Sequence, residues 1–277
     1  MLRWGVAARG SRPHDRGVTR DALFCCLMLA SGAAHAGSTG SFKAEYDGYS
    51  HGLVTLKMSA QLTLTPTGYS GRLAFHTAGL VGFMVHVESD SQVSGHFVGD
   101  HAVPDGFSST GVLHGTNRTA TIHWKDGSPV IDAIAPPPEL ERSPVPPDMR
   151  AHTIDALSAM ATMLREAGQS GHCDGEATIF DGRRVSHLAA RTVGHETPPP
   201  SQKAHFDQPA LRCDFEGQEL AGFLKSESEA DQRRPRHGIA WLAPLVPNAP
   251  LVPERVLFEH KVLGQVTLYL TSVSGLP

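Results

Sequence analysis

Twelve consecutive residues, from Val54 to Thr65, alternate strictly between apolar and polar side chains. The apolar positions are Val54, Leu56, Met58, Ala60, Leu62 and Leu64. A period of two places them all on one face of a β-strand, whereas a helix would scatter them around its circumference. The segment therefore predicts a half-buried strand about 40 Å long, at about 3.3 Å per residue. Such a strand needs apolar cover along the whole of one face.

The rest of the chain repeats this pattern less regularly. A turn sequence at 65–68 precedes a second alternating run, which predicts a hairpin. Further strands are expected over 80–87, 93–98, 111–115 and 119–125, with a turn at 116–118. Asp-Gly pairs, which favour tight turns, begin at residues 47, 105, 126, 174 and 181. Together these features predict a mainly β protein whose antiparallel curved sheet forms a β-roll or half-barrel.

One segment has helical spacing. Residues 153–167 place Leu157, Met160 and Leu164 on one face, with Thr153 as the expected N-cap and Gly168 as the expected terminator. A proline-rich connector over residues 135–150 precedes this segment. We expect one amphipathic helix packed against the sheet. It could form a lid over an open end or only cover a sheet edge, and the sequence leaves both alternatives open.

The N-terminus has the pattern of a secretory signal peptide. Residues 1–21 contain five arginines, residues 22–30 form a short apolar core, and Ala34-His35-Ala36 is a cleavage-type sequence. We predict a signal peptide over 1–36, a single β-rich domain over 37–277 and a periplasmic location. Removing the signal peptide changes the net charge from −4 to −7, which argues against nucleic acid and anionic lipid headgroups as partners. No apolar run is long enough for a transmembrane helix.

Two cysteines lie beyond the predicted signal peptide, Cys173 and Cys213. An even number of cysteines in an oxidising compartment favours a disulfide. Two buried thiols, or a metal pair completed by His172, are the alternatives.

The search for catalytic and cofactor motifs is negative. Nucleophile-elbow, zinc-protease, phosphate-loop, dinucleotide-binding and C-x-x-C patterns are absent. Histidine is frequent, with sixteen copies, and imidazole binds transition metals. However, no two histidines have the spacing of a metal site on one strand or helix. The closest pairs are His96 with His101, and His76 with His86. We assign no catalytic residue, metal ligand or cofactor.

Several inward-facing apolar residues could line a groove between the sheet and the helix rather than fill a core. The candidate groove lining consists of Leu56, Met58, Ala60, Leu62, Phe75 and Leu157.

The order of several short motifs resembles the exported bacterial proteins grouped as domain of unknown function 3108. The motifs are Tyr46-Asp47-Gly48-Tyr49, Thr77-Ala78-Gly79-Leu80, Thr153-Ile154-Asp155-Ala156, Cys173-Asp174-Gly175, Phe180-Asp181-Gly182-Arg183-Arg184, Leu211-Arg212-Cys213-Asp214-Phe215 and Ala240-Trp241-Leu242. The resemblance spans about residues 42–272. It implies a periplasmic β-roll or half-barrel with one or two helices, and it implies no activity.

We therefore favour an exported envelope protein that is not an enzyme and that binds or carries an apolar, lipid-like ligand or an envelope partner protein. One alternative is a periplasmic hydrolase or carbohydrate-active enzyme, with acid and base groups drawn from Asp47, Glu88, Asp105 or His114. Another is a structural scaffold without ligand. The oligomeric state stays open.

Overall fold

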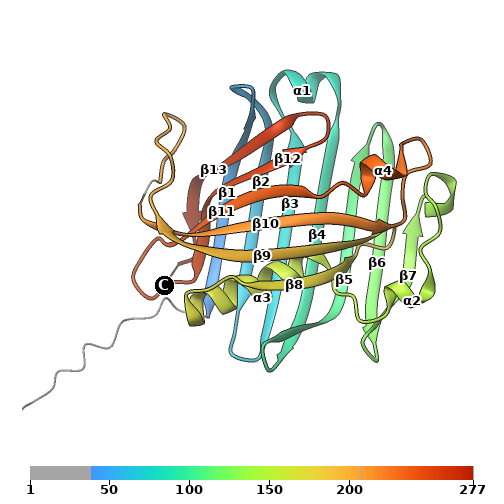
Figure 1. Ribbon diagram of the computed structural model, residues 1–277, viewed down its shortest axis with the longest axis horizontal. Helices are drawn as coiled ribbons and strands as arrows, with labels where there is room; N and C mark the ends of the chain where they lie inside the picture. The colour runs from blue at the N-terminus through green and yellow to red at the C-terminus, as the bar shows by residue number, and fades with distance from the viewer. Residues whose placement is uncertain (1–38, 207, 277) are drawn as a thin grey trace, which may run out of the picture. The chain divides into compact units, whose positions relative to one another are not determined.

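The computed structural model describes residues 39–206 and 208–276. The predicted signal peptide lies outside the described residues. Within them, thirteen strands form one antiparallel sheet (Figure 1). The strands are β1 (Gly40–Ser50), β2 (Leu53–Leu64), β3 (Gly68–Thr77), β4 (Val87–Val98), β5 (His101–Leu113), β6 (Thr116–Lys125), β7 (Ser128–Ala135), β8 (Gly175–Phe180), β9 (Val185–Glu196), β10 (Ala210–Ala221), β11 (Arg236–Pro244), β12 (Leu251–His260) and β13 (Gly264–Ser274).

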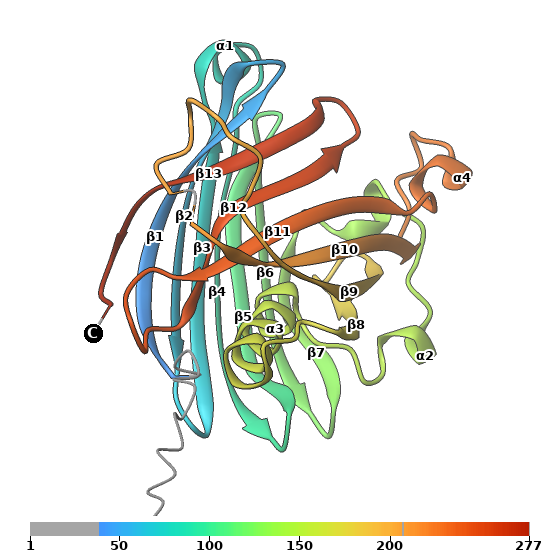
Figure 2. The ribbon, with the colours of Figure 1, turned by 60° about the vertical axis from the view of Figure 1, so that its left-hand side comes forward.

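The sheet consists of two meanders joined by their terminal strands. The first half consists of β1–β7 and the second of β8–β13, and in each half neighbouring strands are consecutive in the chain. The halves join where β1 pairs with β13. Figure 2 shows the strands of the two halves running at an angle to each other, with α3 between them. The expectation of a mainly β, antiparallel, curved sheet is confirmed. The half-barrel is a correction, because the sheet curls into a nearly closed barrel whose two edges are β7 and β8.

The described residues also contain four α-helices rather than the single one expected. They are α1 (Gly79–Met84), α2 (Pro147–Arg150), α3 (Ala156–Ser170) and α4 (Glu229–Gln232), with a short 3-10 helix at Pro138–Leu140. The predicted strand over 80–87 is wrong in its first part, because α1 occupies that segment. Gly79, with φ of +59°, turns the chain away from the direction of β3.

Helix α3 begins and ends three residues later than the sequence pattern predicts. Asp155 is its N-cap, and its side chain accepts from the backbone N–H groups of Leu157 and Ser158 at 2.9 Å. The expected cap, Thr153, instead donates to the carbonyl of Arg150. Gly171, with φ of +74°, ends the helix in the left-handed conformation that glycine adopts without strain.

The strand prediction for the alternating run is confirmed, since β2 spans Leu53–Leu64. Its even-numbered residues from Leu56 onward lie on the sheet face against which α3 packs, and Gln61 lies on the opposite face, so Leu62 is 2% exposed while Gln61 is exposed. A disulfide joins Cys173, just after α3, to Cys213 on β10, as predicted. This bond ties the helix to the second half of the sheet.

Candidate functional site

Helix α3 covers only part of one sheet face, which we call the inner face. Leu157 and Leu164 of α3 share a core cluster with Leu62, Tyr69 and Val93 of β2–β4. Side chains from β10 to β13 belong to the same cluster. This end of the inner face is therefore filled, and α3 is held between the two halves of the sheet (Figure 2).

A buried polar chain fixes α3 to the sheet. The hydroxyl of Tyr69 on β3 donates to Ser158 Oγ at 2.7 Å, and Ser158 Oγ donates to Asp155. Asp155 and Ser158 are both fully enclosed. Burial raises the pKa of the Asp155 carboxyl and also that of the Tyr69 phenol. This arrangement orients α3 rather than forming a reaction centre, because it lies under the helix and away from solvent.

The inner face opens beyond α3. Met58 on β2 is followed across the strands by Phe75, Ser89 and Gly111 without a register shift. The next row includes Leu73, Ser91 and Ser109, and Ser91 Oγ lies 2.9 Å from Ser109 Oγ. We call six of these residues the inner patch: Met58, Leu73, Phe75, Ser89, Ser91 and Ser109. All six are half-buried, whereas Leu62, Val93 and Phe107 farther along the same face are buried.

The second half of the sheet contributes further apolar side chains to the same core cluster. Phe215 of β10 and Val256 and Phe258 of β12 are half-buried and pack against it. The Phe215 ring lies directly on Gly238, where an added Cβ would stand 2.1 Å from the ring. Gly238 is therefore needed to seat this aromatic side chain.

The structure divides the six predicted groove residues into two groups. Ala60, Leu62 and Leu157 are buried in the core cluster. Leu56 and Met58 are half-buried and pack against that cluster, and Phe75 is half-buried beside Met58. The alternation in the sequence places the β2 residues of this set on one face of the sheet, but it does not show where α3 stops covering that face.

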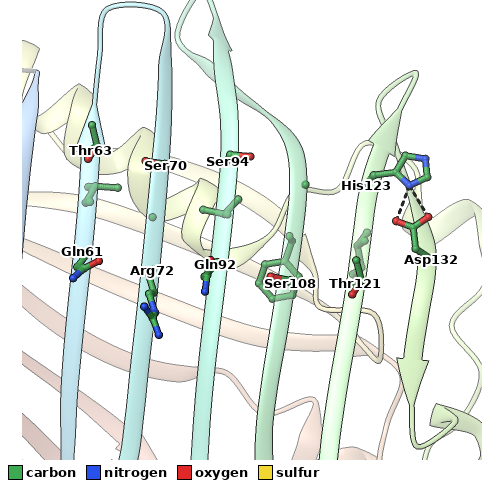
Figure 3. A pocket seen from close by; sticks show the side chains of 16 residues that line it. Gln61, Thr63, Ser70, Arg72, Gln92, Ser94, Ser108, Thr121, His123 and Asp132 are labelled. Carbon is green, nitrogen blue, oxygen red and sulfur yellow. Dashed lines mark hydrogen bonds and ion pairs between the residues drawn. The ribbon is translucent and has the colours of Figure 1, made fainter.

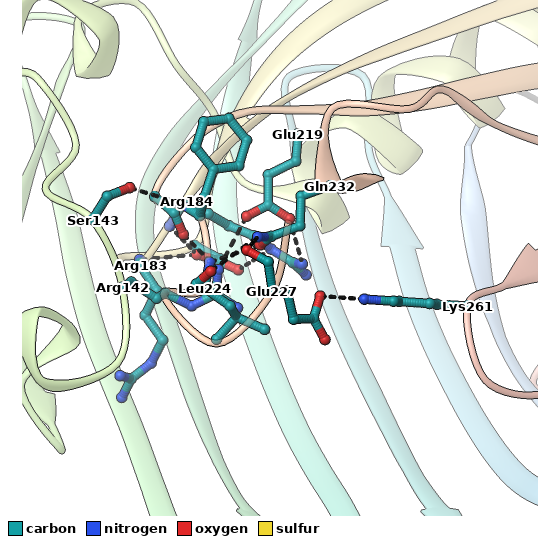
Figure 4. A network of polar contacts seen from close by, with 12 residues as sticks. Arg142, Ser143, Arg183, Arg184, Glu219, Leu224, Glu227, Gln232 and Lys261 are labelled. Carbon is teal, nitrogen blue, oxygen red and sulfur yellow. Dashed lines mark hydrogen bonds and ion pairs between the residues drawn. The ribbon is translucent and has the colours of Figure 1, made fainter. Parts of the chain in front are cut away.

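An arginine cluster lies at the end of the inner-patch rows. Arg118 follows Gly111 in the Met58 row, and its Nη2 donates to both carboxylate oxygens of Glu141 at 2.7 Å. Arg142 donates to Glu219 at 3.0 Å, and Arg184 reaches the same carboxylate at 3.5 Å (Figure 4). Burial lowers the pKa of Arg142, while the hydrogen bond from Arg118 lowers the pKa of Glu141. The interior thus changes from apolar at Met58 to cationic at Arg118.

Arg183 links the two edges of the sheet. It lies in the turn between β8 and β9, and it donates to the carbonyls of Ala135 at 2.6 Å and Pro136 at 2.9 Å, beside the end of β7. Sequence reasoning missed the role of these arginines. It also placed Arg118 in a turn, but the turn falls at His114-Gly115, whose φ angles of +51° and +77° reverse the chain two residues earlier.

The acidic groups considered for hydrolysis do not converge. Asp47 on β1 pairs with Lys57, and Glu88 lies three strands away, about 14 Å at about 4.8 Å per strand. Asp105 contacts His96 at 3.0 Å, and His114 lies in the turn after β5. Within residues 39–206 and 208–276, no three His, Cys, Asp or Glu side chains are arranged to hold a metal ion.

A cleft of about 700 Å³ lies on the outer face of β2–β7, opposite α3. A second cleft, of about 730 Å³, is bordered by β1–β6, and its lining includes Met58, Phe75 and Ser89 of the inner patch. The first is lined by exposed polar side chains such as Gln61, Arg72 and Gln92, with the His123–Asp132 pair at its end (Figure 3). This first cleft is polar, so it does not suit an apolar ligand.

Comparisons with known proteins give a family and two distant structural likenesses. The model of the family described as "Protein of unknown function (DUF3108)" matches residues 41–271. No curated protein matches the chain.

A β-barrel-like protein of domain of unknown function DUF1849 from Brucella abortus has a TM-score of 0.48 and 11% identity, covering 86% of this chain and 98% of its own. A putative outer membrane lipoprotein-sorting protein domain from Vibrio parahaemolyticus has a TM-score of 0.31 and 10% identity, covering 85% of each chain. No helix in the described part of the chain has the length and apolarity to cross a bilayer.

Proposed function

The chain belongs to the DUF3108 family of proteins of unknown function, and we propose that it is an extracytoplasmic binding or carrier protein for a lipid-like molecule. Its ligand would place an apolar chain on the inner patch and a polar or anionic group toward Arg118. The protein would act by shielding this chain from water, without chemical change.

The observation that carries this proposal is the change in burial along the inner face. Leu62 and Val93 are enclosed under α3, whereas Met58, Leu73 and Phe75 on the same face are only half-buried. Half-exposed apolar side chains in a concave sheet gain free energy when another apolar surface covers them, at about 25 cal/mol per Å². An acyl chain is narrow and flexible enough to fit along such rows.

The polar residues of the inner patch suit the other part of the ligand. Ser89, Ser91 and Ser109 offer hydroxyl groups between the apolar residues and Arg118. Arg118 holds Glu141 through a single Nη atom, and its buried Nε has no hydrogen-bond partner among the described residues. A guanidinium is well suited to carboxylate and phosphate groups.

The disulfide supports a location outside the cytoplasm, because such bonds persist in oxidising compartments. The signal peptide predicted over residues 1–36 would take the chain there.

Displacement of a fluorescent acyl probe tests the proposal. The exported protein should enhance the fluorescence of a long-chain acyl probe, and unlabelled phospholipid or fatty acid should reverse the enhancement. An unchanged probe spectrum at saturating protein would favour the scaffold without ligand.

A further inference from the structure

One end of the sheet concentrates exposed apolar side chains. Six of the ten large apolar side chains that are exposed in the described ranges belong to three turns at this end. We call them the apolar rim: Leu53, Leu80, Phe83, Met84, Val85 and Val262. Phe83, Met84 and Val262 have 91%, 81% and 82% of their surface in solvent. A contiguous exposed apolar patch commonly marks an interaction site.

The three turns are in contact with one another. Helix α1 lies against the start of β2, where the Ala78 N–H donates to the Thr55 carbonyl at 2.9 Å. The β1–β2 turn touches the β12–β13 turn, because Ser50 Oγ donates to the Leu263 carbonyl. Figures 1 and 2 both show α1 and these two turns at the same end of the sheet.

The turns lack negative charge. Residues 50–53, 78–86 and 260–264 contain no Asp or Glu, but they contain Lys261 and three histidines. Lys261 pairs with Glu227 from outside the turns. The chain without its predicted signal peptide has a net charge of −7, so the absence of acidic residues from these turns departs from its general composition.

Tyr49 and Lys203 lie beside the β1–β2 turn that contains Leu53. Lys203 Nζ stands 3.7 Å from the centre of the Tyr49 ring and donates to the Gly52 carbonyl at 2.7 Å. Tyrosine and lysine are typical of the boundary between lipid tails and headgroups, where the aromatic ring and the ammonium group meet different surroundings. Their position fits insertion of Leu53 to a shallow depth.

The rim is continuous with the apolar interior. Leu56 is three residues from Leu53 on β2, and Leu263 follows Val262. Both Leu56 and Leu263 are half-buried and pack against the main core cluster.

We propose that the apolar rim docks the protein onto a lipid bilayer, with Phe83, Met84 and Val262 inserted among the lipids. The rim side chains lie on α1 and on two connections between strands, all at one end of the sheet, which favours insertion into a fluid surface over docking of a folded partner. This docking rests on the rim alone and does not require a ligand on the inner patch.

Vesicle flotation tests the docking. The exported protein is mixed with vesicles of phosphatidylethanolamine and phosphatidylglycerol, and the bound fraction is compared with that of the double variant Phe83→Ser/Met84→Ser. The matched control is Val98→Ser/Leu140→Ser, which removes two exposed apolar side chains outside the rim. Thermal melts establish that both variants are folded.

We expect the rim variant to bind vesicles at least about tenfold more weakly than the wild type, and the control to bind equally. Equal flotation of the rim variant, or no flotation of the wild type, would overturn the docking. If the wild type fails to float but sediments as a dimer that the rim variant abolishes, the rim is an interface between two copies instead. Retention of the acyl probe by the rim variant would show that ligand binding is independent of docking.

Discussion

Tyr69 on β3 donates a hydrogen bond of 2.7 Å to Ser158 on α3, 89 positions later in the chain. Ser158 in turn donates to Asp155, the residue that caps the same helix. One buried chain of three side chains thus sets both where α3 begins and where it sits on the sheet. Because the inner patch starts where α3 ends its cover, this contact also defines the extent of the candidate site.

Tyr69→Phe should lower the free energy of unfolding by about 1–2 kcal/mol, since the buried Ser158 hydroxyl loses a partner while the ring stays packed. Tyr49→Phe is the control, because Tyr49 makes ring contacts with Tyr269 and Lys203. Urea denaturation of both variants checks this. An equal loss at position 49 would indicate that the Tyr69 hydroxyl contributes nothing specific.

Asp155 should give stability an unusual dependence on pH. Its folded-state pKa is raised by burial, so the folded state binds the proton more tightly than the unfolded state does. The resulting stabilisation is present below the unfolded pKa, about 3.9, and is lost as pH rises through the folded pKa.

The free energy of unfolding of the wild type, minus that of Asp155→Asn, should therefore decrease as the pH rises from about 3.5 to about 7. Asp174 has a pKa lowered by its hydrogen bonds with Thr192, so the difference for Asp174→Asn should move in the opposite direction. Denaturant titrations at several pH values measure both. The same slope for the two variants would contradict this assignment.

Substitutions along β2 separate the two sheet faces. Leu62→Asp buries an unpaired charge and should lower the free energy of unfolding by about 4 kcal/mol. Gln61→Lys on the exposed face should leave it nearly unchanged. Ala60→Phe should cost about 1–3 kcal/mol, because Ala60 is 8% exposed between Ala44 and Leu73. Thermal melts rank the three variants, and equal losses at 61 and 62 would refute the face assignment.

The exported protein should contain no reactive thiol before reduction, because Cys173 and Cys213 form a disulfide. Replacing both by serine should lower the free energy of unfolding by up to about 4 kcal/mol on the loop-entropy account. Thiol labelling under denaturing conditions, with and without reductant, counts the free groups. Two labelled cysteines without reductant would show that the bond is absent.

How far the sequence predicts this structure depends on how local each determinant is. The alternation over Val54–Thr65 predicts β2 because every residue of a strand obeys the same period. The α1 segment is mispredicted because its apolar residues, Leu80 to Val85, resemble a strand. The chain is redirected at Gly79, which has a positive φ and lies so close to Val54 that an added Cβ would stand 2.5 Å from its carbonyl oxygen.

The candidate site is less predictable than the fold. Apolar periodicity shows that Met58 and Leu62 share a face, but only the position of α3 makes one half-exposed and the other buried. The sequence offers both Thr153 and Asp155 as caps of α3, and spacing alone does not reveal that Thr153 bonds to Arg150 while Asp155 caps the helix. The arginine cluster joins residues 118, 142 and 184 through tertiary folding, so no local motif identifies it.

Native mass spectrometry of matched variants tests the central claim, that the inner patch holds a lipid-like ligand. Ser89→Phe fills the patch between Phe75 and Gly111, and Ser94→Phe places the same ring on the outer face of the same strand. Each protein is incubated with a lipid extract, repurified, confirmed to be folded by thermal melting and weighed intact. We predict a bound lipid mass on the wild type and on Ser94→Phe, and its loss from Ser89→Phe. A wild type that retains no lipid, or a Ser89→Phe variant that retains as much as the wild type, would contradict the claim.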